Sequence, residues 1–500
     1  MAVTPYKQLE QEWQRLHAFG GALSLLRWDA AVMMPRGSAD VRGEQLAAIE
    51  TEQHAVLTSP KVSRLLDRAQ AGAASLDDWQ RANLREMVRQ RDHAIATPVS
   101  LISRLARVTS VAEVRWAEAR EKQDFSIFAP HLEEVLQLVR DKAALLGQAR
   151  NLSPYDALMD GLTPGVRSAE IDPVFRALSR RLPGLIREAI ERQSAMKTLP
   201  ITGKFTPGRQ RALIVEVMKA FGFRFDRGRL DESDHPFTEG VAGDIRVTTK
   251  LDQANPFSGL LAALHETGHV LYDLGVPREW RAQPVGKERG IALEESQALF
   301  IEMVICRSRS FLQYLKPLLE KHFGVSGPEW EPENLYRVLT RVRRGMIRVD
   351  ADELTYPLHI VLRYGIERNL LDGRLAVRDL PEAWNQGMQD RLEVRPANDA
   401  EGCLQDVHWA HGAFGYFPSY ALGAVIAAQL FETLRSAAPE LEEHIATGQF
   451  ATVTSWLARN VHAEGARLTP QELVQQVTGK GFSAPIALRY LEARYLEEAR

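Results

Sequence analysis

An apolar segment that carries two histidines is the strongest constraint on the fold of this chain. Residues 260–271 are apolar except for the sequence His265-Glu266-Thr267-Gly268-His269. Histidines four residues apart lie on the same face of an α-helix, so both imidazoles can reach one metal ion. The glutamate between them lies close enough to contact a water molecule on that metal. The spacing is that of a zinc peptidase site and predicts a buried helix.

The alternative is a buried helix whose histidines make only hydrogen bonds. Asn255-Pro256 offers a helix start, and Gly275 with Pro277 offers a helix end. A helix that is apolar on most faces is buried, so its polar side chains need partners. Because one metal ion satisfies the two histidines and the glutamate together, we prefer the metal site.

A third metal ligand has to come from elsewhere in the chain. A catalytic zinc takes three protein ligands and leaves its fourth position to water. Cys306 and Cys403 form no ligand-spaced pair, so we expect no thiolate ligand. The apolar helix predicted over 291–305 begins with Glu294 and Glu295. Either carboxylate can be the ligand, or both can simply complement the helix N-terminus; spacing alone does not choose between them.

Composition excludes several classes of partner. The 500 residues are 45% hydrophobic and 25% charged, with a net charge of −3. This balance favours neither nucleic acid nor an anionic membrane as a partner. We expect no transmembrane helix, because no apolar run reaches about 18 residues, and no signal peptide is visible. Two cysteines far apart predict no disulfide framework, so we expect a cytoplasmic protein.

Most of the sequence has the apolar period of an α-helix. The predicted helices span residues 5–27, 38–57, 60–72, 76–122, 129–150, 168–196, 207–221, 312–322, 332–345, 353–370, 378–391, 420–436, 438–446, 450–461 and 469–477. No linker divides the chain, so we predict one mostly helical domain over residues 1–500.

Residues 223–251 are the exception to the helical period. Glycines and the β-branched stretch 244–251 predict turns and a strand just before the metal helix. The strand is either an edge strand that pairs with an extended substrate or part of a small structural hairpin. We weigh the two equally.

Three polar clusters lie outside the predicted metal helices. Taken alone, each has a structural interpretation: an ion pair, a packed histidine, or aromatic side chains that fill space. The clusters are Asp234-His235-Pro236-Phe237, residues 347–352 (Ile-Arg-Val-Asp-Ala-Asp), and residues 402–409 (Gly-Cys-Leu-Gln-Asp-Val-His-Trp), the last followed by the aromatic stretch 414–420.

Together with the histidine motif, these clusters resemble the carboxypeptidase Taq family of metallocarboxypeptidases. That family carries D-H-P-F, H-E-x-x-H, I-R-x-x-A-D and G-x-x-Q-D-x-H-W, which occur here intact at 234–237, 265–269, 347–352 and 402–409. The family motif H-E-[SG]-Q corresponds to residues 294–297, where Glu294 replaces its histidine. Trp28-Asp29 and Met34-Pro35 also resemble the family, so the resemblance spans nearly the whole chain.

The resemblance implies a particular metal site and fold. The third ligand falls on Glu295, whereas Glu294 replaces a supporting histidine and can change metal affinity or ion preference. The implied metal is zinc, with cobalt able to substitute. The implied fold is mostly α, neurolysin-like and often homodimeric, with a deep groove and one small β-sheet beside the active site. We expect an N-terminal helical part over about 1–200 and a metal-site core over about 223–425.

The resemblance also implies an activity, the release of single C-terminal amino acids from peptides with a free C-terminus. Arg348 matches the family arginine to which we assign the terminal carboxylate, because a planar guanidinium binds carboxylates well. Asp352 is expected to orient Arg348. His408, Tyr416 and Tyr420 are expected to hydrogen-bond the substrate or the developing oxyanion.

The remaining expectations concern the groove, the chemistry and the alternatives. The segment containing His235 is expected to form part of the groove wall. Glu266 is expected to take a proton from water as general base and to deliver it to the leaving amine. We predict broad specificity. The alternatives are an endo-oligopeptidase of the neurolysin-like fold, which needs no carboxylate clamp, and a non-catalytic helical peptide-binding protein.

Overall fold

The computed structural model describes residues 3–497, which form two compact units. The first unit contains the described residues up to 94, residues 198–339 and residues 430–479; the second contains residues 95–197, 340–429 and 480 onward. The predicted metal-site core over 223–425 is divided between the units at residue 340. This division does not test the prediction of one catalytic domain over 1–500, which stays a prediction.

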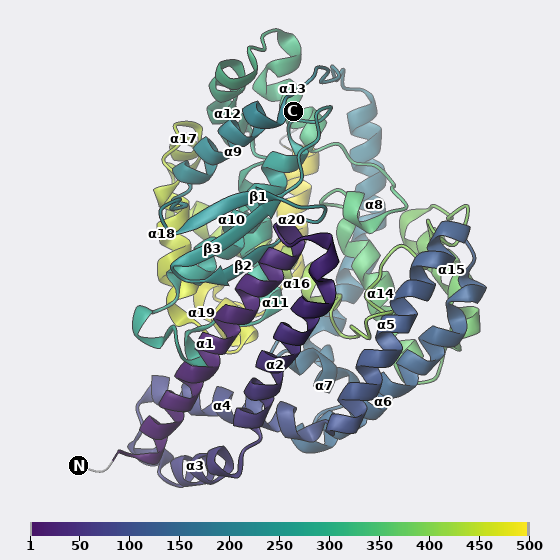
Figure 1. The fold of residues 1–500 in the computed structure, drawn as a ribbon. Helices are drawn as coiled ribbons and strands as arrows, with labels where there is room; N and C mark the ends of the chain where they lie inside the picture. The colour runs from purple at the N-terminus through teal and green to yellow at the C-terminus, as the bar shows by residue number, and fades with distance from the viewer. Residues whose placement is uncertain (1–2, 498–500) are drawn as a thin grey trace. The chain divides into compact units, whose positions relative to one another are not determined.

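The first unit combines helices with one small sheet (Figure 1). Its elements are α1 (Pro5–Val32), α2 (Ala39–Leu57), α3 (Pro60–Ala71), α4 (Asp78–Ala96), α9 (Pro207–Ala220), β1 (Gly228–Glu232), β2 (Thr238–Val241), β3 (Asp244–Thr249), α10 (Ser258–Gly275), α11 (Ile291–Leu299), α12 (Arg309–Phe323), α13 (Pro332–Leu339), α17 (Leu441–Ala446), α18 (Ala451–Asn460) and α19 (Pro470–Thr478), together with the later residues of α16 (Pro418–Ala437).

The described residues of the second unit form helices and connecting loops, without a strand. Its elements are α5 (Val99–Lys122), α6 (Ala129–Arg150), α7 (Pro154–Asp160), α8 (Ser168–Ser194), α14 (Tyr356–Leu371), α15 (Leu380–Leu392), α20 (Ala484–Glu492) and the first residues of α16. The prediction of a mostly α fold with one small β-sheet is therefore confirmed for the part of the chain that the structure describes. Within that part, each helix is too short or too polar to span a bilayer.

Three differences from the predicted helices have local or tertiary causes. The run over 76–122 is two helices, because Pro98 disfavours a helical conformation at Thr97. The helix predicted over 332–345 ends at Leu339, since the side chain of Gln193 bonds the backbone of Thr340 and Val342 instead. The short helices α7 and α20 were not predicted, because fewer than three turns carry little periodic signal.

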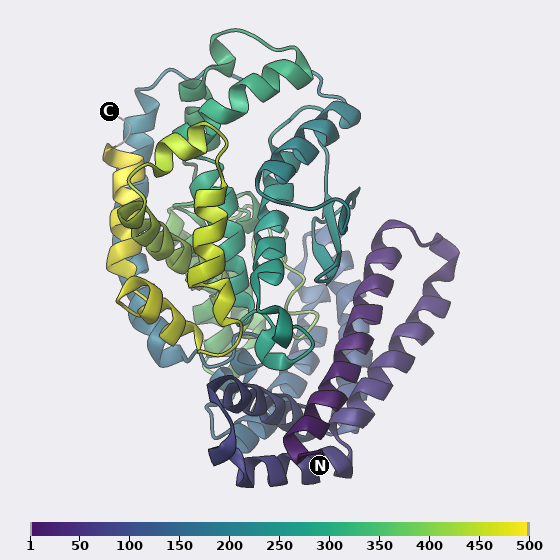
Figure 2. The same ribbon diagram turned by 90° about the vertical axis from the view of Figure 1, so that its left-hand side faces the viewer.

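The long antiparallel pair α1 and α2 builds the N-terminal part of the first unit, as the purple ribbons of Figures 1 and 2 show. Thr4 caps α1 by accepting a hydrogen bond from the backbone N–H of Lys7, and a proline opens the first turn. One face of the pair packs into a core shared with α3 and α4. That core includes Tyr6, Leu9, Trp13, Leu65 and Met87.

The sheet has the order β1-β3-β2, so β3 is its central strand. β1 runs parallel to β3 with Leu230 opposite Val247, and β2 runs antiparallel to β3 with Thr238 opposite Val247. The predicted strand over 244–251 is β3. Its two edges are already paired, so of the two alternatives the one in which this strand is an edge strand that pairs with substrate is wrong. β2 is therefore an edge strand, and its first residue, Thr238, contacts Glu266 of α10.

Candidate functional site

The two helices that carry the predicted metal ligands approach each other at a glycine. α10 contains His265, Glu266 and His269, and α11 contains Glu295. A Cβ at Gly268 would lie 2.5 Å from the Cα of Ala298 on α11, closer than any side chain tolerates. Glycine at this position therefore lets α11 lie against the histidine-bearing part of α10.

His265, His269 and Glu295 form the candidate metal centre. Their ligand atoms all lie within 4.8 Å of one another, and His265 Nε2 is 3.8 Å from Glu295 Oε2. Two imidazole nitrogens and one carboxylate oxygen are the donor set of a catalytic zinc, with a fourth position left for water. The residues present therefore fit the implied metal. Of the two acids that spacing left open, Glu295 is the one whose carboxylate joins this group.

A fourth side chain, Glu302, supports the centre from the outside and was not predicted. It follows α11 in the π-helical segment Phe300–Ile305, and its Oε2 lies 3.2 Å from His265 Nδ1. Arg307 forms an ion pair with Glu302. A proton on Nδ1 that is held by Glu302 leaves Nε2 free for a metal. The sequence signal was an acid seven residues after Glu295 in the same apolar run, on the same helix face.

The surroundings of the two histidines shift their pKa values in opposite directions. Burial lowers the pKa of His265, but the hydrogen bond with Glu302 and the charges of Glu295 and Glu266 outweigh burial and raise this pKa to about 9. Burial, assisted by the charge of His265, lowers the pKa of His269 to about 3. A group of carboxylates thus gathers around His265 and favours a positive charge there, whether proton or metal.

Glu266 lies beside the metal group and contacts the sheet. It is 7% exposed, and its Oε2 accepts a hydrogen bond of 2.7 Å from Thr238 Oγ1 at the start of β2. Burial raises the pKa of Glu266, while His265 and the Thr238 hydroxyl oppose that rise. A carboxylate with a raised pKa is suited to accept and return a proton near neutral pH.

Glu294 points to a different environment from Glu295. Burial and the charges of Glu288 and Glu295 raise the pKa of Glu294, whereas Lys287 lowers it. Asp273, one turn after His269 on α10, also has a pKa raised by burial and by Glu288. Where the family carries a histidine, this chain therefore places a third acid into an acidic cluster beside the metal residues.

Arg348 lies in the second unit, in an ion-pair cluster that includes Asp406 and Arg363. Arg348 Nε and Nη2 donate to Asp406 Oδ1 at 3.0 and 2.9 Å. Arg363, which is fully buried on α14, donates from Nε to Asp406 Oδ2 at 2.7 Å. The side chain of Gln405 accepts from the Arg348 backbone at 3.0 Å and from Arg363 Nη2 at 2.7 Å.

Electrostatics hold this cluster ionised. Burial raises the pKa of Asp406, but the charges of Arg363 and Arg348 outweigh burial and hold this pKa well below its ordinary value. Burial lowers the pKa of Arg363 to about 10, and Arg348 adds to that effect. Two guanidiniums therefore share one carboxylate. Asp406 and Arg363 are not among the predicted site residues, although Asp406 stands inside the 402–409 motif.

The other predicted substrate residues of the second unit divide into two groups. His408, Tyr416 and Tyr420 lie near Arg348: the His408 and Tyr416 rings are 5.5 Å apart, and the Arg348 guanidinium lies 5.2 Å from the Tyr420 ring. Burial lowers the pKa of His408 to about 4, so its imidazole is neutral. Asp352 instead accepts the backbone N–H groups of Arg343, Leu354 and Thr355 before α14.

His235 lies in the first unit, on the exposed turn that leads into β2. Its backbone oxygen accepts a hydrogen bond from the Ser233 hydroxyl at 2.6 Å. Two residues later, the Phe237 N–H donates to Thr248 Oγ1 on β3 at 3.0 Å. The segment thus fixes the start of the strand from which Thr238 reaches Glu266.

Comparison with known proteins gives one consistent result. The family model described as "Carboxypeptidase Taq (M32) metallopeptidase" matches residues 8–495. Thermostable carboxypeptidase 1 of Thermus thermophilus is 35% identical over 495 residues, 97% of each chain, and that of Pyrococcus furiosus is 32% identical over 98% of each. The solved structure of Trypanosoma cruzi metallocarboxypeptidase 1 covers 99% of both chains with 38% identity and a TM-score of 0.96.

Proposed function

Because the chain belongs to the carboxypeptidase Taq (M32) metallopeptidase family, we propose that it is a zinc-dependent carboxypeptidase that releases single C-terminal residues from peptides, with broad specificity. Membership makes the chain a metal-dependent peptide hydrolase of the carboxypeptidase type. The observation that carries the finer proposal is the convergence of His265, His269 and Glu295 beside the buried carboxylate of Glu266.

Zinc, with cobalt as a substitute, is the metal we propose for His265, His269 and Glu295. When bound, such an ion would polarise the scissile carbonyl and lower the pKa of a water molecule. Glu302 keeps a proton on His265 Nδ1 and so presents Nε2 as the donor. Arg307 in turn helps to hold Glu302 in its ionised form: burial raises the pKa of that carboxyl, but Arg307 and His265 together outweigh burial and lower it to about 2.

Glu266 is the general base that we propose. Its carboxylate takes a proton from the attacking water and later gives this proton to the leaving amine. The Thr238 hydroxyl occupies Oε2, so Oε1 is the oxygen that we assign to proton transfer. Thr238 therefore positions the base without taking part in the proton transfer itself.

Arg348 is the residue that we propose for the C-terminal carboxylate of the peptide. Asp406 holds its Nε and Nη2 groups, which leaves the remaining guanidinium hydrogens for a second carboxylate. His408, Tyr416 and Tyr420, gathered beside Arg348, are proposed to contact the substrate. We propose that Asp406 orients Arg348, since the Asp352 carboxylate instead accepts hydrogen bonds from backbone N–H groups and from the Thr355 hydroxyl.

Mass spectrometry of a mixed peptide library, incubated with the protein and zinc or cobalt, tests the proposal. We expect ladders of single C-terminal losses from peptides with a free C-terminus, and none from the same peptides as C-terminal amides. Internal cleavage that ignores amidation would identify an endo-oligopeptidase. Absence of both bound metal and hydrolysis would identify a non-catalytic peptide-binding protein.

A cytoplasmic homodimer is the location and assembly that we propose. The support for the location is that Cys306 and Cys403 are both free and buried, as in a reducing compartment. The support for the dimer is the family resemblance. Sedimentation velocity on the purified protein measures the assembly, and a single species at 56.1 kDa, the mass of one chain, would contradict a dimer.

A further inference from the structure

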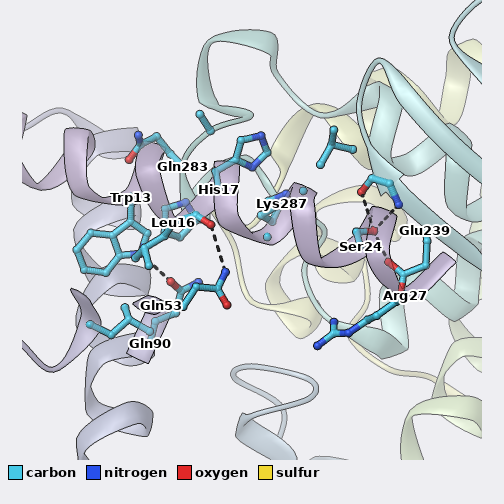
Figure 3. Close-up of a pocket in the computed structure, with 17 residues that line it drawn as sticks. Trp13, Leu16, His17, Ser24, Arg27, Gln53, Gln90, Glu239, Gln283 and Lys287 are labelled. Atoms are coloured by element: carbon cyan, nitrogen blue, oxygen red, sulfur yellow. Dashed lines mark hydrogen bonds between the residues drawn. The ribbon is translucent and has the colours of Figure 1, made fainter. Parts of the chain in front are cut away.

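A polar pocket of about 410 Å³ lies in the first unit, away from the metal ligands (Figure 3). Its walls come from α1, α2, α4, the strand β2 and the loop 282–287. Gly20 and Gly21 form part of the α1 wall and leave space between the side chains of His17 and Ser24. A volume of this size accommodates an amino-acid side chain together with its backbone.

The centre of the pocket carries two basic side chains that lack partners. His17 on α1 and Lys287 in the loop 282–287 lie together in the centre of the view. Burial lowers the pKa of His17, and the charge of Lys287 lowers it further. Among residues 3–497, neither side chain makes a hydrogen bond or an ion pair. A lowered pKa keeps His17 neutral near pH 7, so Lys287 supplies the positive charge at this point of the pocket and His17 supplies a hydrogen-bonding ring nitrogen.

The acids nearest to Lys287 form no ion pair with it within residues 3–497. Burial and neighbouring acids raise the pKa of Asp273 and of Glu294, which favours their neutral forms, and the charge of Lys287 only opposes this rise. Glu239, the acid that lines the pocket itself, accepts a hydrogen bond from Ser24. Ser24 is seven residues after His17 on α1, which is about 10 Å along the helix axis.

The pocket is connected to the proposed catalytic base through β2. Thr238 at the start of β2 bonds Glu266, and the following residues, Glu239, Gly240 and Val241, line the pocket. A strand advances about 3.4 Å per residue, so the pocket begins within a few residues of the base. An enzyme that removes one residue has only that residue on the C-terminal side of the scissile bond. Any peptide group that extends along β2 into the pocket therefore belongs to the N-terminal side.

We propose that this pocket binds an acidic side chain of the peptide substrate, at a residue N-terminal to the scissile bond, with Lys287 as its counter-charge and His17 as a hydrogen-bond donor. The inference rests on the proposed carboxypeptidase function and deepens it by naming a preferred substrate class. Gln90, whose Oε1 is taken by Trp13 Nε1 at 2.7 Å, presents its amide nitrogen as a further donor in the same pocket.

Initial rates on a matched peptide series test the proposal. Pentapeptides with one fixed C-terminal residue carry either Glu or Gln at each of the second to fifth positions from the C-terminus. We expect the wild-type kcat/KM to favour Glu over Gln by about fivefold at one of these positions, the range of a partly exposed ion pair. Lys287→Met and His17→Gln should each reduce this ratio toward one, and Lys287→Glu should favour Lys at that position.

The Glu and Gln peptides are compared on the same enzyme preparation. The ratio of the two kcat/KM values therefore does not depend on the fraction of folded enzyme. Lys204→Met, an exposed lysine outside the pocket, is the matched control and should keep the wild-type ratio. No preference for Glu at any position would overturn the proposal, as would a preference that survives both Lys287→Met and His17→Gln. Competition by free glutarate as strong as that by the Glu peptide would assign the pocket to a small dicarboxylate and overturn the peptide site.

Equilibrium binding separates this inference from the proposed function. If no peptide is cleaved with zinc or cobalt, the carboxypeptidase proposal fails, and the pocket is then tested by fluorescence titration of labelled Glu and Gln peptides. Tighter binding of the Glu peptide that is lost in Lys287→Met supports the pocket. Equal binding of the two peptides overturns it.

Discussion

The metal group of the first unit and the arginine cluster of the second are opposite in charge. Around His265 and His269, the carboxylates of Glu266, Glu295 and Glu302 face one guanidinium, that of Arg307. In the second unit, the guanidiniums of Arg348 and Arg363 face one carboxylate, that of Asp406. Each cluster is buried, and each has one sign of charge in excess.

The excess in each cluster matches the ligand that we propose for it. Buried charge without compensation is costly, so an unbalanced group favours a ligand of the opposite sign. The excess of carboxylates suits a divalent cation, and the excess of guanidiniums suits a peptide carboxylate. In each cluster a carboxylate orients the proposed ligand-binding side chain. Glu302 orients His265 in the first cluster, and Asp406 orients Arg348 in the second.

The largest effect is expected at Glu266, the proposed general base beside the candidate metal ligands. Glu266→Gln removes the proton acceptor but keeps the shape, so kcat should fall about a thousandfold while bound zinc stays near one per chain. Steady-state kinetics and metal analysis of the same sample check this. Normal turnover in the variant would remove Glu266 from the role of general base.

Asp406→Asn should break the charge balance of the second cluster. It leaves Arg348 and Arg363 facing each other without a carboxylate, which should lower the free energy of unfolding by about 3 kcal/mol. The pKa of Asp406 is depressed, so its contribution is present above the ordinary value near 4 and is lost as pH falls further. Denaturant unfolding at pH 7 and below pH 4 measures both effects, and an unchanged midpoint at pH 7 would contradict the cluster's structural role.

Arg348→Gln should weaken recognition of the free C-terminus. A charge-assisted contact to a carboxylate contributes about 2 kcal/mol, so kcat/KM on free peptides should fall about thirtyfold. C-terminal amides provide the control, because they have no C-terminal carboxylate for Arg348 to contact. If the variant still discriminates free acids from amides as the wild type does, another residue binds the carboxylate.

Glu302→Gln should have the smallest of these effects. It keeps the hydrogen-bonding shape beside His265 Nδ1 but removes the negative charge, so zinc affinity should fall about tenfold. Competition with a zinc-binding dye measures this affinity. Glu294→Gln is the matched control, since Glu294 lies outside the ligand group, and it should keep zinc; a larger loss from Glu294→Gln than from Glu295→Gln would reverse the ligand assignment.

Much of the local structure could be predicted because helical periodicity is a local property. The helix over 129–150 has the predicted bounds, and α2 and α3 differ from theirs by one residue. The failures depend on distant contacts. The helix that begins at Pro332 ends early because the side chain of Gln193, far earlier in the sequence, hydrogen-bonds the backbone of Thr340 and Val342. The strand β3 is central because β1 and β2 pair with both of its edges.

The sequence alone predicts which side chains of α10 can hold a metal. The spacing of His265 and His269 puts both imidazoles on one face, because an α-helix repeats every 3.6 residues. The choice between Glu294 and Glu295 depended on how α11 lies against α10, which the close contact at Gly268 decides. The pairing of Arg348 with Asp406, 58 residues apart, likewise exists only in the folded chain. Side chains on one element are related by backbone geometry, whereas those on different elements are related only by packing.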